Sequence, residues 1–211
     1  MNEKFFSLDP EKQRRIVDAG FRIFSQSSYK KTPVSEIAED AGISKSLLFH
    51  YFQNKKELYL FLWNHAADMV RKAQSRLEDP YEGNLFDLLE RDLQMKFRLI
   101  RRYPYIANFG FRAVYEKEPE ISKAIQGRFQ AYALKSWQET LEKLNPEDYR
   151  PGLDLQMMCR QIYWTGAGYL WQSACLGPLD PEQMEKDFLK MLAFWRSTYE
   201  NPEKRNKEEE K

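Results

Sequence analysis

A short run of basic, polar and aromatic side chains carries most of the chemistry that this sequence offers. Lys45 and Ser46 can donate hydrogen bonds to base edges or to phosphates, and the apolar Leu47 and Phe49 could touch thymine methyl groups. Lys55 follows shortly afterwards, where a phosphate backbone would run. Side chains of these types can bind the major groove of DNA if one helix presents them together on an outward face.

A helix over about residues 44–52 would present them in that way. Leu48 and Phe52 are spaced for its inward face, since residues four apart are neighbours on a helical surface. The side chains left for its flanks and outer face are mostly apolar or aromatic: Leu47, Phe49, His50 and Tyr51. These side chains either pack on neighbouring helices or lie against DNA. We favour packing for Tyr51 alone and DNA contact for the set as a whole.

The preceding segment has the signals of a second short helix. Thr32 is suited to the N-cap and Pro33 to the first helical position. An apolar stripe with helical spacing follows: Val34, Ile37, Ala38 and Ala41. Gly42 stands where a left-handed residue would end this helix, and Ser44 offers the next N-cap. One helix therefore ends and another begins within a few residues, which is typical of a helix-turn-helix.

Three spaced runs, residues 37–45, 48–52 and 55–58, resemble the N-terminal signature of the tetracycline-repressor (TetR) family of transcriptional regulators. The resemblance covers about residues 9–62. It implies an all-helical homodimer whose helix-turn-helix heads bind a palindromic operator. It also implies a C-terminal domain in which a small ligand releases the DNA, with repression as the usual outcome.

The resemblance also implies roles for individual residues. Thr32 and Lys55 match positions that contact phosphate. Positions that contact bases and backbone fall on a second group: Lys45, Ser46, Leu47, His50 and Tyr51. Phe49 stands where the family often has tyrosine, so it offers no hydroxyl to a phosphate, although it can pack on a sugar or a thymine methyl group. Ser44 completes the predicted DNA-binding set.

The whole chain is predicted to be all-α, with about nine helices and no strand of sustained alternation. Besides the two helices of the turn motif, the expected helices cover about residues 10–28, 54–78, 85–102, 104–115, 119–144, 153–175 and 181–199. The first of these would brace the turn motif, giving a DNA-binding domain at 1–53. A helical ligand-binding and dimerisation domain would follow at 54–200, with a disordered charged tail at 201–211.

The expected helix at 153–175 is apolar nearly all round, which the edge of a single domain cannot bury, and the expected helix at 181–199 has a broad apolar stripe. Gly166 and Gly168 would each cost roughly 1 kcal/mol relative to alanine in a helix, so we expect another backbone or a ligand to approach closely there. We predict a homodimer with these interface residues: Ile162, Gly166, Tyr169, Leu170, Phe188, Met191, Leu192 and Trp195. The alternative is that both helices are buried inside a monomer.

A mostly apolar or aromatic small-molecule effector is predicted for the second domain, since rings with polar handles beside glycines suit such a pocket. The candidate ligand-binding residues are Phe97, Phe109, Arg112, Tyr115, Trp137, Tyr163, Trp164 and Trp171. Each ring could instead be ordinary core, and Arg112 could lie over apolar neighbours at the surface. Ligand binding would shift the helix at 54–78 and spoil the spacing of the heads. Without a ligand, the chain would be a constitutive repressor or a DNA-organising dimer with a protein partner.

Composition restricts the other classes of function that the chain could have. The net charge is +1, from 33 basic and 32 acidic residues, so any DNA-binding face depends on placement and neutralises few phosphates. No apolar run approaches the roughly 18 residues of a membrane helix, and the N-terminus lacks a signal-peptide stretch, so a cytoplasmic location is expected. Cys159 and Cys175 are expected to be buried free thiols, since one helix would hold them more than roughly 20 Å apart.

Catalysis is the least favoured class of function. The chain has two histidines, His50 and His65, and no paired metal-ligand spacing surrounds them. It contains no glycine-rich phosphate loop and no nucleophile-elbow motif. We therefore expect no enzyme activity, no metal site and no cofactor.

Overall fold

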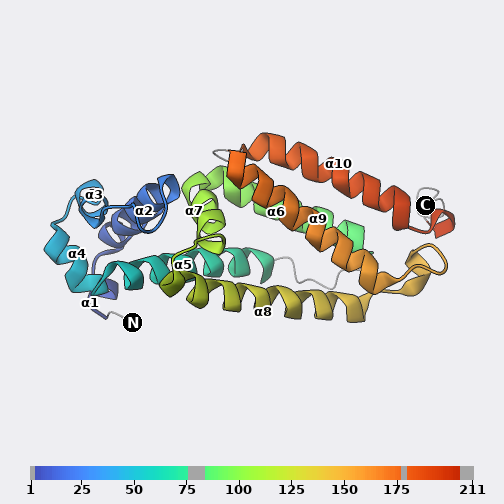
Figure 1. Cartoon of the computed structure of the whole chain (residues 1–211), viewed down its shortest axis with the longest axis horizontal. Helices are drawn as coiled ribbons and strands as arrows, with labels where there is room; N and C mark the ends of the chain where they lie inside the picture. The colour runs from blue at the N-terminus through green and yellow to red at the C-terminus, as the bar shows by residue number, and fades with distance from the viewer. Residues whose placement is uncertain (1–2, 76–83, 177–179, 205–211) are drawn as a thin grey trace. The chain divides into compact units, whose positions relative to one another are not determined.

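Helices form every regular element in the part of the chain that the computed structural model describes, residues 3–75, 84–176 and 180–204 (Figure 1). The side chains of residues 174–176 also lie outside this description. The elements are α1 (Glu3–Phe6), α2 (Pro10–Gln26), α3 (Val34–Asp40), α4 (Lys45–Phe52), α5 (Lys55–Gln74), α6 (Leu85–Arg102), α7 (Pro104–Val114), α8 (Pro119–Lys143), the 3-10 turn η2 (Pro146–Asp148), α9 (Leu155–Leu176) and α10 (Pro181–Tyr199). Nine of these helices have seven residues or more, which confirms the all-α prediction.

The structure departs from the predicted elements in a few places. Helix α1 and the 3-10 turn η2, which are each a single turn, were not predicted. The predicted breaks at 79–80 and 177–178 lie outside the described residues, as do residues 205–211 of the predicted tail. Disorder from residue 201 is a wrong expectation for the described part of this tail. There the Asn201 amide donates to the Asp148 carbonyl at 2.9 Å, and Lys204 Nζ donates to the Asp148 carboxylate at 2.8 Å.

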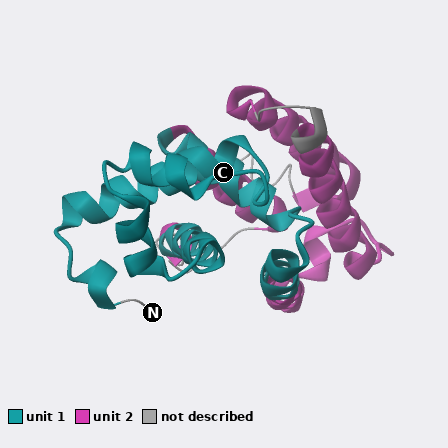
Figure 2. Cartoon of the chain, turned by 60° about the vertical axis from the view of Figure 1, so that its left-hand side comes forward, with its two compact units in different colours: residues 1–72, 102–130 teal, residues 73–101, 131–211 magenta. Residues whose placement is uncertain are grey.

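The chain divides into two compact units (Figure 2). Unit 1 comprises residues 1–72 and 102–130, and unit 2 comprises 73–101 and 131–211. This division differs from the predicted boundary after residue 53, because the first turns of α5 and all of α7 contribute to the core around the turn motif. Fully buried side chains from these two helices share that core: Leu58, Tyr59, Leu62, Phe109 and Ala113.

The core of unit 1 is rich in aromatic rings. Asp9 caps α2 by accepting a hydrogen bond from the Lys12 amide at 2.9 Å, as predicted. Ring centroids of Phe24 and Tyr59 lie 4.8 Å apart, and those of Tyr59 and Phe109 also lie 4.8 Å apart. These edge-to-face contacts join α2, α5 and α7 into one hydrophobic cluster.

The α3–α4 turn depends on one glycine. Gly42 has φ +68°, the left-handed conformation predicted for it, and its amide donates to the Glu39 carbonyl at 2.9 Å. The start of α3 differs from the prediction, because Pro33 rather than Thr32 occupies the N-cap position. The Thr32 hydroxyl instead donates to the Ser28 carbonyl at 3.0 Å.

Gly42→Ala should lower the free energy of unfolding by about 1–2 kcal/mol, since a Cβ makes the left-handed conformation costly. A urea unfolding curve measures this difference. Gly127→Ala is the matched control, because Gly127 lies in α8 and a Cβ there would meet no other atom within 4 Å. The control should be neutral or slightly stabilising, and equal stability of the two variants would contradict our account of the turn.

Unit 2 has its own core, formed by residues of α6, α9 and α10 together with Tyr149, which follows η2. Its buried members are Leu85, Phe86, Tyr149, Met158, Cys159, Ile162, Leu192 and Trp195. Arg196 of α10 lies 2.7 Å from the Asp87 carboxylate of α6 and 3.3 Å from that of Glu200, so a charge network joins α10 to α6. The Tyr149 hydroxyl accepts a hydrogen bond from the Leu85 amide at 3.2 Å, at the start of α6.

The Cys159 thiol is free and buried, as predicted, and burial raises its pKa to about 11. The side chain of Cys175 lies outside the described residues. Among the residues that the structure describes, no helix combines the length and the apolar character needed to cross a membrane.

Candidate nucleic-acid interface

Helix α4 is anchored by one face and open on the other. Leu48, Tyr51 and Phe52 are buried in the core of unit 1. Ser44 caps the helix by accepting a hydrogen bond from the Leu47 amide at 3.2 Å, as predicted. The opposite side presents exposed polar side chains and two half-buried apolar ones: Ser44, Lys45, Ser46 and His50, with Leu47 and Phe49. The first turn of α4 can therefore reach a partner without unfolding the core.

Two predicted DNA-contacting residues, Thr32 and Tyr51, lie in the core instead of at the surface. Thr32 is 1% exposed and its hydroxyl is engaged within the α2–α3 loop, so it cannot reach a phosphate in this conformation. Tyr51 is 5% exposed, and its ring centroid lies 6.4 Å from that of Phe5 in α1. The unpredicted helix α1 explains the burial of Tyr51, because it places the Phe5 ring against Tyr51 and Phe52.

Lys45 extends along its own helix. Its Nζ lies 5.8 Å from the centroid of the Phe49 ring, within the range of a cation–π interaction. Phe49 therefore has a second possible role, which is to hold this lysine beside the outer face of α4.

Lys55 follows α4 through a sharp turn. Gln53 has φ +57°, an uncommon conformation for a residue with a side chain, and Asn54 then caps α5 by accepting from the Glu57 amide at 2.9 Å. Lys55 Nζ lies 4.8 Å from the centroid of the Tyr29 ring. Burial lowers the pKa of Lys55, and the carboxylates of Glu116 and Glu120 oppose that shift. The ammonium is thus held against the α2–α3 loop, close in sequence to the predicted recognition helix.

The predicted dimer residues divide into two groups. Ile162, Leu192 and Trp195 are 4%, 3% and 6% exposed within a single chain. The core of unit 2 already covers Ile162 and Leu192, so their assignment to the interface was wrong, and Trp195 keeps only a small exposed fraction beside α9. The others are half-buried: Gly166, Tyr169, Leu170, Phe188 and Met191. A Cβ added to Gly166 would lie 3.6 Å from the Phe188 ring, an ordinary contact, so packing against α10 does not require glycine there.

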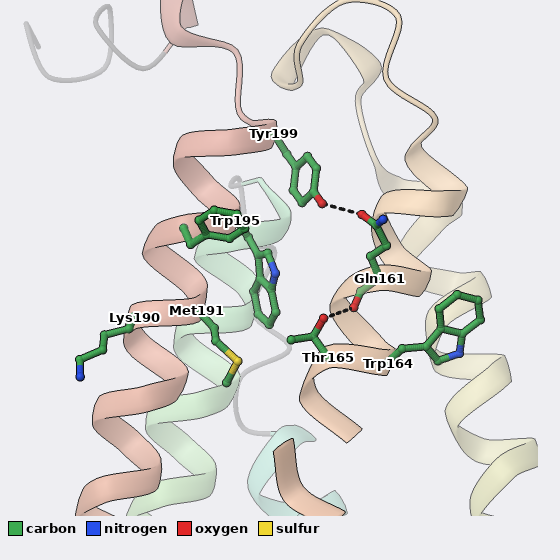
Figure 3. A pocket seen from close by; sticks show the side chains of 8 residues that line it. Gln161, Trp164, Thr165, Lys190, Met191, Trp195 and Tyr199 are labelled. Atoms are coloured by element: carbon green, nitrogen blue, oxygen red, sulfur yellow. Dashed lines mark hydrogen bonds between the residues drawn. The ribbon is translucent and has the colours of Figure 1, made fainter. Parts of the chain in front are cut away.

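Side chains of α9 and α10 border an open hollow of about 560 Å³ in unit 2 (Figure 3). Its lining is Gln161, Trp164, Thr165, Lys190, Met191, Phe194, Trp195 and Tyr199. The Tyr199 hydroxyl donates to Gln161 Oε1 at 2.6 Å and thereby joins the two helices at one end of the hollow (Figure 3). Trp164 and Phe194 are 58% and 63% exposed, so large apolar side chains border the hollow without being covered.

The segment that contains α3 and α4 also matches a known protein family. The family model described as bacterial regulatory proteins, tetR family, matches residues 16–61, which contain α3, α4 and most of α2. The transcriptional regulator AcrR of Shigella flexneri is 24% identical over 83 residues, which is 39% of this chain and 39% of AcrR. The transcriptional activator FasR of Mycolicibacterium smegmatis is 29% identical over 106 residues, 46% of this chain and 48% of FasR. The chain thus spans less than half of either relative's length.

A solved structure extends the likeness beyond the head. CprB, a TetR family protein from S. coelicolor A3(2), aligns with a TM-score of 0.72 over 92% of this chain and 91% of CprB, at 17% identity. Residues 16–61 of this chain carry the TetR-family sequence. At this identity, the likeness to CprB shows that the TetR fold includes the second unit.

The predicted ligand-binding residues of this chain do not gather in one site within either unit. Phe109, Arg112 and Tyr115 belong to unit 1, where Phe109 is fully buried and Arg112 Nε donates to the Ser25 carbonyl at 2.7 Å. The remaining five belong to unit 2: Phe97, Trp137, Tyr163, Trp164 and Trp171. Phe97 is core, Trp137 and Tyr163 pack on each other at 6.2 Å, and both remaining tryptophans are exposed. Helical periodicity could not distinguish the buried positions from the exposed ones in this set, because it does not show which helices pack against each other.

Proposed function

We propose that this TetR-family chain binds a palindromic DNA operator as a homodimer and regulates transcription. One observation carries the proposal: α4 buries one face in the core while its first turn exposes Ser44, Lys45 and Ser46. A recognition helix meets base edges through its N-terminal residues in just this way. We place the protein in the cytoplasm, because the operator of a bacterial regulator lies on the chromosome.

The exposed side chains of α4 suit separate kinds of contact. Lys45, Ser46 and His50 can hydrogen-bond base edges, and the partly exposed Leu47 and Phe49 can touch thymine methyl groups. Ser44 and Lys55 lie at opposite ends of α4 and can contact phosphates, which fix the register but carry no sequence information. Such a short helix reads only a few base pairs, so a specific site requires two heads related by two-fold symmetry.

The exposed faces of α9 and α10 support the proposed dimer. Met157, Trp164 and Trp171 recur at heptad spacing along α9, so they share one side of that helix. On α10, Leu189 and Phe194 are also exposed. Several large apolar side chains exposed on two packed helices of a regulator mark an interaction site. We propose that a second copy covers this surface, including the hollow beside Trp164.

An effector stays a prediction for this chain. Trp164 is the one predicted ligand-binding residue that lines the hollow, and the hollow belongs to the surface that we assign to the dimer. Repression likewise stays the expected outcome, although FasR is named as an activator. Titration of apolar and aromatic small molecules into an operator complex tests the effector: release of DNA would support it, and unchanged affinity for all candidates would favour a constitutive regulator.

Lys55→Gln tests the phosphate contact in this proposal. The variant should weaken binding to operator and to scrambled DNA by similar factors, since phosphate contacts do not depend on sequence. The slope of log affinity against log salt should become shallower by about two, because each of two heads loses roughly one phosphate contact. Fluorescence anisotropy over a salt series measures both effects.

Lys135→Gln is the matched control for Lys55→Gln. Lys135 lies in the part of α8 that belongs to unit 2, where it is exposed and 3.7 Å from Glu139, so its loss removes one charge without changing unit 1. This control should keep the wild-type salt slope. An unchanged slope in Lys55→Gln would contradict the phosphate contact.

A further inference from the structure

A buried carboxylate joins two segments of unit 1 that are far apart in the sequence. Glu116 lies between α7 and α8 and is 8% exposed. Its Oε2 accepts a hydrogen bond from the Tyr29 amide at 2.8 Å, and its Oε1 accepts from the Lys117 and Glu118 amides at 2.9 and 3.1 Å. A buried charge is costly unless it is hydrogen-bonded in this way. Glu116 therefore fastens the α7–α8 turn to the α2–α3 loop.

Tyr29, which is hydrogen-bonded to Glu116 through its amide, also contacts Lys55 through its ring. The Tyr29 side chain is 7% exposed, and its ring centroid lies 5.2 Å from that of Tyr59 in an edge-to-face contact. Lys55 Nζ lies 4.8 Å from the Tyr29 centroid and donates to the Lys30 carbonyl at 3.4 Å. The ammonium thus has one contact with the ring and one with the next residue of the same loop. If Tyr29 moves, both contacts of the ammonium change.

Further contacts hold the same loop from the same side. Arg112 of α7 donates to the Ser25 carbonyl at 2.7 Å, near the end of α2. Burial raises the pKa of Tyr29, and the Glu120 carboxylate in the first turn of α8 adds to the shift. The end of α2 and the loop before α3 are therefore held by α7 and by the α7–α8 turn, all within unit 1.

We propose that Glu116 is a positioning residue for DNA binding, because its carboxylate fixes Tyr29 and Tyr29 in turn fixes the Lys55 ammonium for a phosphate. The inference rests on the proposed function, since it assigns Lys55 to phosphate. A lysine side chain that is already held in place loses less conformational freedom on binding than a free one. Glu116 touches no DNA itself and acts only through the loop.

Amide hydrogen exchange tests the first step without any DNA. Glu116→Gln offers a neutral acceptor with one oxygen, and Glu116→Ala offers none, so exchange at Tyr29 should accelerate by about tenfold in the first variant and further in the second. Glu118→Gln is the matched control, because it removes one charge from the same turn and leaves all three hydrogen bonds of Glu116 in place. Unchanged protection of Tyr29 in both Glu116 variants would overturn the proposal. If the alanine variant does not fold, the glutamine variant decides alone.

A double-mutant cycle with Lys55 tests the second step. Glu116→Gln alone should weaken operator binding by about tenfold and make the salt slope shallower, with the same oligomeric state as the wild type. Added to Lys55→Gln, the same change should cost less than about twofold, because the residue through which it acts is already gone. Equal losses in both backgrounds would show that Glu116 does not act through Lys55. Absence of DNA binding by the wild type would instead refute the proposed function, and the exchange result would still decide whether Glu116 fixes Tyr29.

Discussion

Replacing Lys45 and His50 together with alanine is expected to lower operator affinity by about 100-fold or more. Both side chains are exposed on α4, whose other face is held in the core by Leu48 and Phe52. Each base contact is worth about 1–3 kcal/mol, and a symmetric dimer makes every contact twice. Affinity for scrambled DNA should fall much less, because it depends chiefly on phosphate contacts. Fluorescence anisotropy with both duplexes measures the two affinities.

Lys123→Ala is a suitable control for this double variant. Lys123 is exposed on α8 in the same unit, so its removal changes the charge of unit 1 without altering α4. Its ratio of operator to scrambled affinity should match the wild type. Circular dichroism should show unchanged helicity in all variants, since none of these side chains is buried. If the double alanine variant binds the operator with the affinity of the wild type, α4 is not the recognition helix.

Replacing both Trp164 and Phe194 with glutamate is expected to convert the proposed dimer into a monomer. These side chains are 58% and 63% exposed in the single chain, so their replacement removes no core packing there. In a dimer they would be covered, and the introduced carboxylates would then be buried without partners at a cost of several kcal/mol. Size-exclusion chromatography with light scattering should give a mass near 25.3 kDa for the variant and twice that mass for the wild type.

Leu134→Glu separates this effect from a general effect of surface charge. Leu134 lies on α8 and is 67% exposed, so it is as accessible as Trp164 in α9 and Phe194 in α10. The control should remain dimeric. The monomeric variant should also bind the operator about 100-fold more weakly, since a second head no longer binds at high effective concentration. If the double glutamate variant remains dimeric, the dimer interface does not include Trp164 and Phe194.

The helix-turn-helix was largely predictable because its signals are local. Gly42 takes the left-handed conformation, Ser44 caps α4, and Leu48 and Phe52 face the core, each as the sequence predicted. Caps, turn residues and helical periodicity depend on neighbours a few positions away, so one sequence is enough to find them. The outward direction of Lys45 follows from the same periodicity.

The errors in the site concern contacts between distant segments. Tyr51 is buried because α1 brings Phe5 against it, and a four-residue helix has too few residues to show periodicity. Arg112 was considered as a ligand anchor, but it lies beside Ser25 because α7 packs with the head. Glu116 was missed for the same reason, since nothing in its local sequence points to the Tyr29 amide.

The helices of unit 2 show a further limit of periodicity. The apolar character of α9 nearly all round predicted a partner for this helix, but it did not show which neighbour each residue meets. Ile162 faces the core of its own chain, whereas Trp164, two positions later, is exposed. Both residues have the apolar character of an interface, and only the packed structure separates them.

Binding of the wild-type protein to the DNA upstream of its own gene tests the central claim most directly. Fluorescence anisotropy should be recorded with this duplex and with a scrambled duplex of equal length, over a series of salt concentrations. The account predicts a saturable complex with two chains per site, and an affinity about 1,000-fold or more above that for the scrambled duplex. Equal affinity for the two duplexes at every salt concentration would contradict it.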